Sequence, residues 1–367
     1  MRVTILGRDF PPAIGGIGDH TDLLADELAR LDHHVTVLCG APAEPRDTFE
    51  VRAVLTRWDR TGHVAIVDAV EQTTPDVIVW QYNPFAVGRR GIAVGAGRLA
   101  RELARCAPLL AYAHELWFPW GRDGLRGLVW ASAQRIQTRG VLRACAATIV
   151  TTEARERDLA RKGIGRHVHR IPVGTNVIPS GAPARERFGI AGNAFVLGHL
   201  GSAGPGRDLA PAREAIAALR EHGTDARLLL IGNTGPIEAS ADGSVISTGL
   251  LSRSDLSDAL FSCDAYLHAD PVGPSVGRRG SLVAALAHGL PLIAYRGPDA
   301  APQLIDGRSV LFTERNASAL MRTLETLAAD PARRRALGDA ARAVHDEEFA
   351  WDLLGKRIVE VIEECAG

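Results

Sequence analysis

Short aliphatic and β-branched runs alternate with longer helical stretches along the 367-residue chain, and the alternation is interrupted once before it restarts. The interruption, Val177–Phe188, contains prolines and shows no strong periodicity, so we expect an inter-domain hinge there. Such alternation is typical of parallel βα units, and this length suits about two domains. The expected buried strands are Val3–Leu6, Val35–Leu38, Val77–Trp80, Leu109–Ala113, Ala147–Thr151, Phe195–Leu200, Ala226–Ile231, Val245–Thr248, Ala265–His268 and Leu292–Tyr295.

The pattern therefore predicts two doubly wound α/β domains. Their expected extents are residues 1–180 and 181–348, and residues 349–367 are expected to form a C-terminal helix. In this last segment the apolar residues fall on one helical face. They are Leu353, Leu354, Ile358, Val361 and Ile362.

Composition and charge narrow the class of protein. Hydrophobic residues make up 46% of the chain and charged residues 23%, which excludes a largely disordered protein. Lysine and arginine (42) nearly balance aspartate and glutamate (43), which argues against a nucleic-acid partner. The five cysteines are widely spaced, and no apolar stretch is long enough to span a membrane. We therefore expect buried thiols and a soluble, cytoplasmic protein.

The first candidate site is a glycine-rich segment, Phe10–Thr21, which follows the first expected strand and leads into a helix. Glycines let the backbone approach a ligand closely, and the free amides at a helix start favour an anion. A tight turn before the helix explains the same residues equally well. A dinucleotide fingerprint would need a third glycine where Thr21 stands, which disfavours an NAD-type oxidoreductase.

The pattern PPxxGGxGDH at Pro11–His20 resembles the N-terminal domain of retaining, GT-B-fold glycosyltransferases of family 4. The resemblance implies two Rossmann-like domains that face a central cleft, with the C-terminal helix crossing back to the first. It also implies attack on the front face of the sugar, with the departing phosphate accepting the acceptor's proton. Further segments follow in the family's order: Tyr112–Glu115, Thr151–Glu153, Ile171–Asn176, Leu200–Arg207, Ile231–Asn233, Thr248–Leu250, Cys263–Ala265 and Ala287–Pro291.

A nucleotide-diphosphate donor needs its developing negative charge stabilised when the glycosidic bond breaks. The chain lacks an Asp-x-Asp metal motif, so we expect fixed donors and no metal or other cofactor. One candidate source of such donors is the segment at 273–281, where two arginines, a glycine and a serine precede a helix. The alternative for this segment is a solvated turn in which Ser281 only caps the helix. By resemblance and chemistry, the expected diphosphate ligands are Gly15, Gly16, Arg207, Arg278, Arg279, Gly280 and Ser281, and the expected nucleotide ligands are Ser202, Gly232, Asn233 and Leu250.

The donor motif departs from the family at two positions. The family has two glutamates separated by seven residues, and the second of them aligns with Ala284. The first aligns between Gly273 and Val276, where no acid is present. Other residues must then hold the ribose and sugar hydroxyls. The candidates are Asp270, Ser275 and Ser281.

The resemblance assigns the first domain to the acceptor. It implies a catalytic role for His114, together with Arg207 of the second domain. A satisfied histidine near the core is the alternative for His114, and a structural role is the alternative for Glu115. The expected acceptor ligands are Gly18, Asp19, His20, Tyr82, Glu115 and Trp117.

One stretch is strongly basic although the whole chain is nearly neutral. Residues 89–143 contain ten arginines, three acids and no lysine, a local charge of +7. Tryptophans at positions 117, 120 and 130 lie among them. The stretch is either a pair of solvated helix faces or a surface for anionic lipid headgroups or a phosphorylated acceptor.

These features predict a metal-independent, retaining hexosyltransferase. Its donor would be a UDP- or GDP-sugar and its acceptor a small polar molecule. One alternative is a membrane-peripheral transferase with a lipid-linked acceptor. Another is a degenerate, non-catalytic GT-B protein that only binds nucleotide sugar. The sequence leaves open the sugar, the nucleophilic atom of the acceptor and the oligomeric state.

Overall fold

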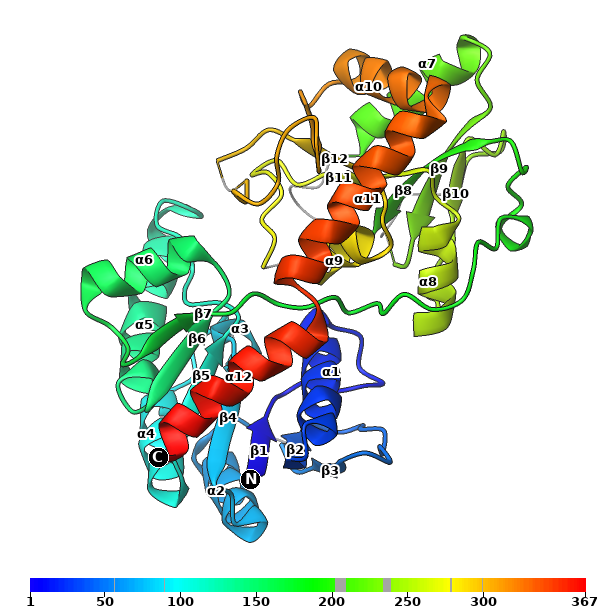
Figure 1. Ribbon diagram of the computed structural model, residues 1–367. Helices are drawn as coiled ribbons and strands as arrows, with labels where there is room; N and C mark the ends of the chain where they lie inside the picture. Colours follow the sequence, from blue (N-terminus) through cyan, green and yellow to red (C-terminus); the bar gives the residue numbers. More distant parts are fainter. Residues whose placement is uncertain (56, 89, 202–208, 234–238, 278, 299) are drawn as a thin grey trace. The chain divides into compact units, whose positions relative to one another are not determined.

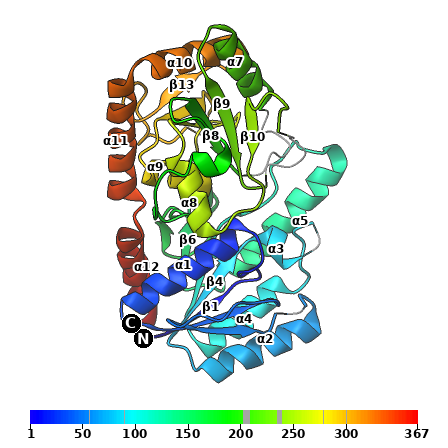
Figure 2. The ribbon, with the colours of Figure 1, turned by 90° about the vertical axis from the view of Figure 1, so that its right-hand side faces the viewer.

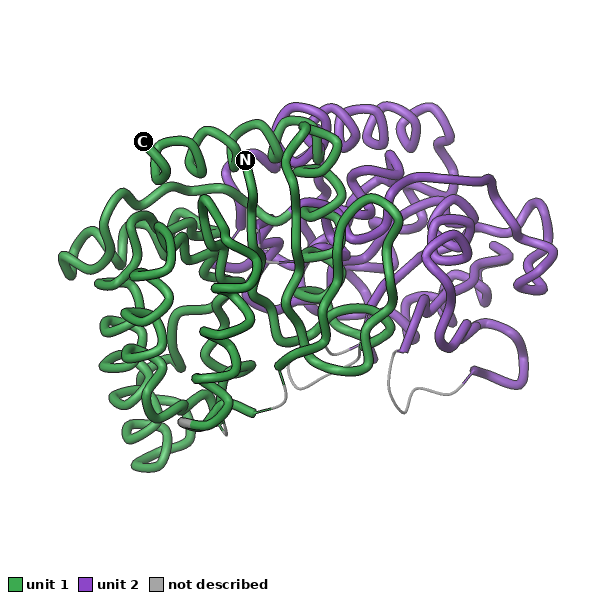
Figure 3. The backbone as a smooth tube through the Cα atoms, turned by 90° about the horizontal axis from the view of Figure 1, so that it is seen from below, with its two compact units in different colours: residues 1–173, 351–367 green, residues 174–350 purple. Residues whose placement is uncertain are grey.

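The computed structural model describes residues 1–367 except 56, 89, 202–208, 234–238, 278 and 299. The chain divides into two compact units, unit 1 (residues 1–173 and 351–367) and unit 2 (residues 174–350), coloured separately in Figure 3. The chain passes from unit 1 to unit 2 after residue 173, whereas the boundary expected from sequence followed residue 180. The chain returns to unit 1 at residue 351, so the C-terminal helix belongs to unit 1.

Unit 1 is built on a seven-stranded parallel sheet with the order β3-β2-β1-β4-β5-β6-β7 (Figure 1). Its strands are β1 (Arg2–Leu6), β2 (His34–Cys39), β3 (Glu50–Ala53), β4 (Val77–Tyr82), β5 (Leu109–Ala113), β6 (Ala147–Val150) and β7 (Val168–Arg170). Its helices are α1 (Gly16–Arg30), α2 (Arg60–Thr73), α3 (Pro84–Val87), α4 (Ala96–Cys106), α5 (Gly124–Leu142), α6 (Glu153–Lys162) and α12 (Trp351–Ala366).

Successive residues of the unit 1 strands point to opposite faces of the sheet, and both faces are buried. Ile5 and Val79 pack in one core with Leu24 of α1 and Ile358 of α12. The core on the other face includes Trp80 and residues of α2, α4, α5 and α6. Side chains therefore alternate along each strand: one residue faces α1 and α12, and the next faces α2, α4, α5 and α6.

Unit 2 has a six-stranded parallel sheet with the order β10-β9-β8-β11-β12-β13. Helices α8 and α9 contribute to the core on one face, α7 and α10 to the core on the other, and α11 to both. Its strands are β8 (Phe195–Leu200), β9 (Ala226–Ile231), β10 (Val245–Ser247), β11 (Ala265–His268), β12 (Leu292–Tyr295) and β13 (Leu311–Thr313). Its helices are η1 (Glu186–Phe188), α7 (Ala210–Glu221), α8 (Arg253–Phe261), α9 (Gly280–Ala287), α10 (Ala317–Ala329) and α11 (Pro331–Glu348).

The strand order reverses once in each sheet, between β1 and β4 in unit 1 and between β8 and β11 in unit 2. Loops leave the carboxyl ends of adjacent strands in opposite directions at such a point, which leaves room for a ligand. The two candidate ligand regions therefore lie after β1, β4 and β5 in unit 1 and after β8 and β11 in unit 2. Among the helices described, none is both long and apolar enough to cross a membrane.

Candidate functional site

The glycine-rich segment of unit 1 runs from the end of β1 into α1. Gly18 allows a close backbone approach, because a Cβ atom there would lie 3.2 Å from the carbonyl of Asp9. The Cβ positions of Gly15 and Gly16 lie in open space, and Asp19 lies in the first turn of α1. This segment is thus a tight loop whose glycine face remains open.

The first turns of α1 bring His20 against the end of β5. His20 and His114 are both buried, with ring centres 5.0 Å apart, edge to face. Tyr112, which precedes His114 by two residues, stacks on it at 4.9 Å. The first residue of α12, Trp351, lies 5.2 Å from His20. Four aromatic rings from α1, β5 and its following loop, and α12 therefore form one cluster, the His20 cluster, at the carboxyl edge of the sheet.

The polar partner of His114 in this cluster is Gln81, from the end of β4. The His114 Nε2 atom lies 2.5 Å from Gln81 Oε1. With this oxygen facing the ring, Nε2–H donates and Nδ1 keeps its lone pair. Gln81 was not among the residues expected at the site, although its neighbour Tyr82 was, and strand parity distinguishes the two.

Both imidazoles of the cluster are neutral at pH 7. Burial lowers the pKa of His20 to about 3. Burial is also the main reason that the pKa of His114 lies well below its usual value, with smaller contributions from the charges of His20 and Arg155. The His20 cluster therefore supplies an apolar wall and neutral hydrogen-bonding groups instead of a fixed positive charge.

Acidification from pH 7 to pH 5 is expected to lower the free energy of unfolding of unit 1 by about 2 kcal/mol through His20 alone. Because the folded-state pKa of His20 lies below the unfolded-state value, the unfolded chain binds more protons between pH 6.5 and about 3. The stabilisation is present above the unfolded pKa and is lost as the pH falls. Urea titrations at several pH values, followed by tryptophan fluorescence, measure this slope.

The fluorescence reports unit 1, because all six tryptophans lie there (positions 58, 80, 117, 120, 130 and 351). The variant His20→Phe provides the comparison, since neither ring nitrogen of His20 has a hydrogen-bond partner among the described residues. Its slope should be flatter by the His20 contribution. Equal slopes in the parent and the variant would contradict a depressed pKa at His20.

Three other predicted acceptor residues of unit 1 have packing partners in the structure. Glu115 Oε2 accepts from Arg155 Nη2 at 2.5 Å. Trp117 is half-buried, with the Arg135 guanidinium 5.1 Å from its ring centre. Tyr82 is completely buried, and its hydroxyl lies 2.9 Å from Thr138 Oγ1. The structure thus gives Tyr82 no surface for an acceptor, because its strand parity directs it into the core opposite the His20 cluster.

In unit 2, Arg279 is the N-cap residue of α9, and its side chain is held by Asp270 from the loop after β11. Arg279 Nη2 donates to Asp270 Oδ2 at 2.7 Å, while Asp270 Oδ1 accepts from the backbone N–H of Val272 at 3.3 Å. Asp270 itself is buried. A guanidinium has five N–H donors, so this bond leaves Arg279 able to bind an anion as well.

The first two residues of α9 are Gly280 and Ser281, so the alternative in which Ser281 caps the helix is wrong. A Cβ atom on Gly280 would lie 3.0 Å from Asn176 Oδ1, which explains the glycine by a close approach of the segment that opens unit 2. Asn176 Oδ1 is buried and has no hydrogen-bond partner in the described part of the chain. Arg279, Asp270 and Asn176 therefore surround the start of α9.

Ala284, which aligns with the family's second glutamate, is buried in the core beside α9, and so is Val276, the last residue of the range in which the first glutamate aligns. The loop after β8 contains the predicted ligands Ser202 and Arg207, which lie outside the described residues, as does Arg278. Of the predicted basic ligands, Arg279 is thus the one that the structure places.

The predicted nucleotide ligands follow β9 and β10. An antiparallel bridge joins Gly232 and Gly249, and the backbone N–H of Gly232 donates to Thr248 Oγ1 at 3.0 Å. Asn233 and Leu250, the residues that follow this bridge, are both exposed. The bridge thus brings these two exposed side chains to neighbouring segments at the same sheet edge.

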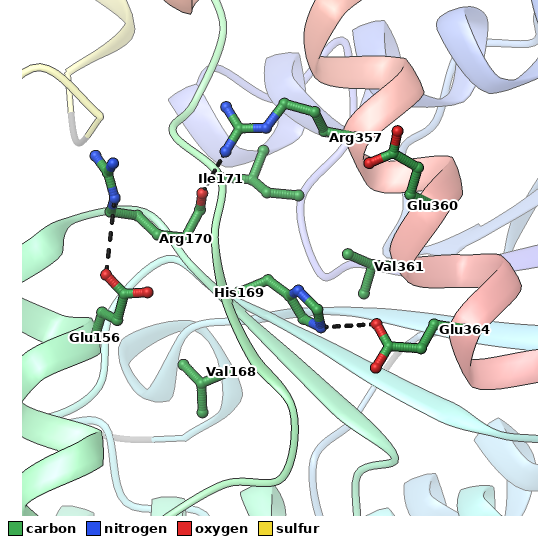
Figure 4. Close-up of a pocket in the computed structure, with 9 residues that line it drawn as sticks. All are labelled: Glu156, Val168, His169, Arg170, Ile171, Arg357, Glu360, Val361 and Glu364. Atoms are coloured by element: carbon green, nitrogen blue, oxygen red, sulfur yellow. Dashed lines mark hydrogen bonds and ion pairs between the residues drawn. The ribbon is translucent and has the colours of Figure 1, made fainter.

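A hollow of about 460 Å³ lies between β7 and α12 in unit 1 (Figure 4). Its polar groups pair across it: Arg357 Nη2 donates to the Arg170 carbonyl at 2.7 Å, and His169 Nε2 lies 3.2 Å from Glu364 Oε2. None of the predicted site residues lines it, so we assign it no part in the reaction. Throughout the described ranges, no group of three or more His, Cys, Asp or Glu side chains could hold a metal ion.

Models of known glycosyltransferase families match the sequences of both units. The model of Glycosyltransferase Family 4 matches residues 14–177, and the model of Glycosyl transferases group 1 matches residues 194–330. A GDP-mannose-dependent monoacylated alpha-(1-6)-phosphatidylinositol monomannoside mannosyltransferase from Corynebacterium glutamicum is 24% identical, and the match covers 99% of this chain and 98% of that protein.

Two solved structures show the same fold. Sucrose-phosphate synthase from Thermosynechococcus elongatus matches with a TM-score of 0.74 at 17% identity, covering 99% of this chain and 98% of the other. HepE from Anabaena, in complex with UDP and glucose, matches with a TM-score of 0.72 at 17% identity and 99% coverage of both chains. With this fold, the two family models define a nucleotide-sugar glycosyltransferase of the GT-B type. Within this class, the chain belongs to glycosyltransferase family 4.

Proposed function

We propose that the protein is a retaining, metal-independent glycosyltransferase that binds its nucleotide-diphosphate sugar in unit 2 and its acceptor in unit 1. The observation that carries this proposal is the Asp270–Arg279 pair at the start of α9. It places an oriented guanidinium beside a helix N-terminus, where both favour a diphosphate. The relative that uses GDP-mannose and the neighbour that binds UDP support GDP or UDP as the nucleotide.

In the proposed reaction, the bond between the sugar C1 atom and the diphosphate oxygen breaks while the acceptor oxygen bonds to C1 on the same face. The negative charge that develops on the diphosphate is stabilised by Arg279 and the amides of α9. The acceptor's proton passes to the departing phosphate, so no side chain has to act as a base. His114, which is neutral, then has the role of a hydrogen-bonding group that orients a sugar hydroxyl.

The variant Arg279→Ala is expected to weaken binding of UDP or GDP by about 1–3 kcal/mol, or roughly 5- to 150-fold, because a charge-assisted hydrogen bond is lost. Isothermal titration calorimetry measures the change, after a thermal-shift screen of UDP-, GDP-, dTDP- and ADP-sugars has identified the nucleotide. Arg220→Ala is the matched control. Arg220, in the last turn of α7, also pairs with an aspartate, Asp225, at 3.2 Å. Unchanged affinity in Arg279→Ala would refute the diphosphate assignment.

A lipid-linked acceptor is the second candidate for the same reaction. It is favoured by the Corynebacterium glutamicum relative, whose name states a monoacylated phosphatidylinositol monomannoside as its acceptor. Transfer assays with water-soluble and lipid-linked acceptors, using the donor identified above, distinguish the two. Nucleotide binding without transfer to any acceptor would instead favour a non-catalytic protein, which the absence of an acid at Ala284 and at residues 273–276 supports.

A further inference from the structure

Helix α5 carries two polar side chains on its buried face, beside the apolar residues of its last turn. Gln134 and Thr138 are completely buried there. Gln134 Oε1 accepts from the Phe118 backbone N–H at 2.6 Å, and Gln134 Nε2 donates to the Arg90 carbonyl at 2.8 Å. Thr138 Oγ1 donates to the Leu116 carbonyl at 2.7 Å. The inner face of α5 thus holds two loops by hydrogen bonds, and its last turn adds Val141 and Leu142 to the apolar core.

The outer face of α5 carries large apolar side chains that are exposed. Leu125 is 83% exposed, Val129 63% and Ile136 74%, and Leu128 lies beside them at 40%. Their spacing of three, four and seven residues places them on one side of the helix. Single exposed apolar residues are normal, but a row of four on one side of a helix, here interrupted by the exposed Ser132, is typical of a surface that binds something. We call this row the α5 face; Figure 2 shows the helix that carries it.

The charges around the α5 face are mostly positive: the one exposed acid beside its start is Asp123, the N-cap residue of the helix. No aspartate or glutamate occurs between Gly124 and Thr152. The exposed arginines are Arg122, Arg126, Arg139 and Arg143. Trp120, also exposed, lies in the loop that enters α5, and the Arg135 guanidinium lies 4.1 Å from its ring centre. The face thus combines an apolar row with flanking arginines and an exposed indole.

We propose that the α5 face docks on an anionic lipid bilayer, with the helix lying in the plane of the interface. A bilayer surface offers both things that this face requires, an apolar interior and negative headgroups. A second copy of the chain would bring arginine against arginine, with no acid on the helix to pair with either. From Leu125 to Ile136 the row spans about 16 Å along the axis, too short to cross a bilayer but long enough to lie in its interface. This inference does not depend on which acceptor the protein uses.

The apolar arm of the test is sedimentation with vesicles. The parent chain should sediment with vesicles of phosphatidylcholine and phosphatidylglycerol and remain largely in solution with phosphatidylcholine alone. The double variant Leu125→Ser with Ile136→Ser should lower the partition coefficient by about tenfold or more, because two inserted side chains are lost. The control is Val64→Ser, which changes an apolar residue of similar exposure on α2. It should sediment like the parent.

A second experiment tests the charges by comparing α5 with α4, the two long helices of the basic stretch at residues 89–143. Arg126→Gln with Arg139→Gln, on α5, should reduce sedimentation with the anionic vesicles and make the remainder less sensitive to salt. Arg101→Gln with Arg105→Gln removes the same charge from exposed positions of α4. A smaller loss in the α4 variant supports docking by α5, whereas an equal loss overturns it in favour of a diffuse basic surface.

Three further outcomes would also overturn the proposal. They are no sedimentation of the parent with anionic vesicles, equal binding to neutral vesicles, and self-association that the Leu125→Ser, Ile136→Ser variant abolishes in sedimentation equilibrium. Nucleotide affinity is measured for every variant and should equal that of the parent. Loss of vesicle binding with intact nucleotide affinity therefore concerns the α5 face alone, and failure of the proposed reaction would leave the vesicle result unchanged.

Discussion

The variant His114→Ala is expected to lower kcat by about 100- to 1,000-fold, while the affinity for the nucleotide stays that of the parent. Removing one preorganised hydrogen-bonding group that acts in the transition state typically has an effect of this size. His114 fits this role because Gln81 fixes its Nε2–H and because Tyr112 and His20 fix its ring plane. Steady-state transfer kinetics measure kcat, and calorimetry measures the nucleotide affinity in unit 2.

A loss of activity could also follow from damage to the core, so a second buried histidine serves as the control. His63 on α2 is as buried as His114, and burial lowers its pKa as well. It packs beside Gly95, against the face of the sheet opposite the His20 cluster. His63→Ala should therefore affect stability but hardly change kcat. If both variants lose activity equally, the role of His114 is structural.

The interior of both sheets could be predicted from sequence because parallel strands buried on both faces are continuous apolar runs. β5, β8, β9, β11 and β12 have the predicted bounds. The edge strands β3, β7 and β13 were missed: they have three or four residues and are not fully buried, which weakens this signal, although β10, an edge strand of the same kind, was predicted. Their existence depends on pairing with a neighbouring strand, which is a tertiary property.

The site was harder to predict because it depends on side-chain direction. At the end of β4, adjacent residues face opposite sides of the sheet, so Gln81 meets His114 while Tyr82 enters the core. Trp351 is distant in the sequence and reaches His20 only because α12 packs in unit 1. The exposed apolar row of α5 shows the same limit. Its helical spacing predicts a core face, whereas the opposite face is the buried one, held by the hydrogen bonds of Gln134 and Thr138 and by the packing of Val141 and Leu142.

The packing of α12 leads to the second large effect: Ile358→Ala is expected to lower the free energy of unfolding of unit 1 by about 2–5 kcal/mol. Ile358 is completely buried in the core that also contains Leu24 and Leu28 of α1, and α12 contacts both α1 and the strands β4 and β5. Removing three carbon atoms there leaves a cavity that a sheet and two helices cannot readily close. Urea unfolding followed by tryptophan fluorescence measures the loss, since every tryptophan lies in unit 1.

Two variants separate this effect from general destabilisation. Lys356→Ala changes an exposed residue of the same helix and should alter the free energy of unfolding by no more than about 0.5 kcal/mol. Ile216→Ala makes an equivalent deletion in unit 2, on the buried face of α7. If the units unfold separately, it should leave the fluorescence transition in place and shift only the helical circular dichroism. A fluorescence midpoint in Ile358→Ala equal to that of the parent would mean that α12 does not unfold with unit 1. The contact between Trp351 and His20 would then not depend on the docking of this helix.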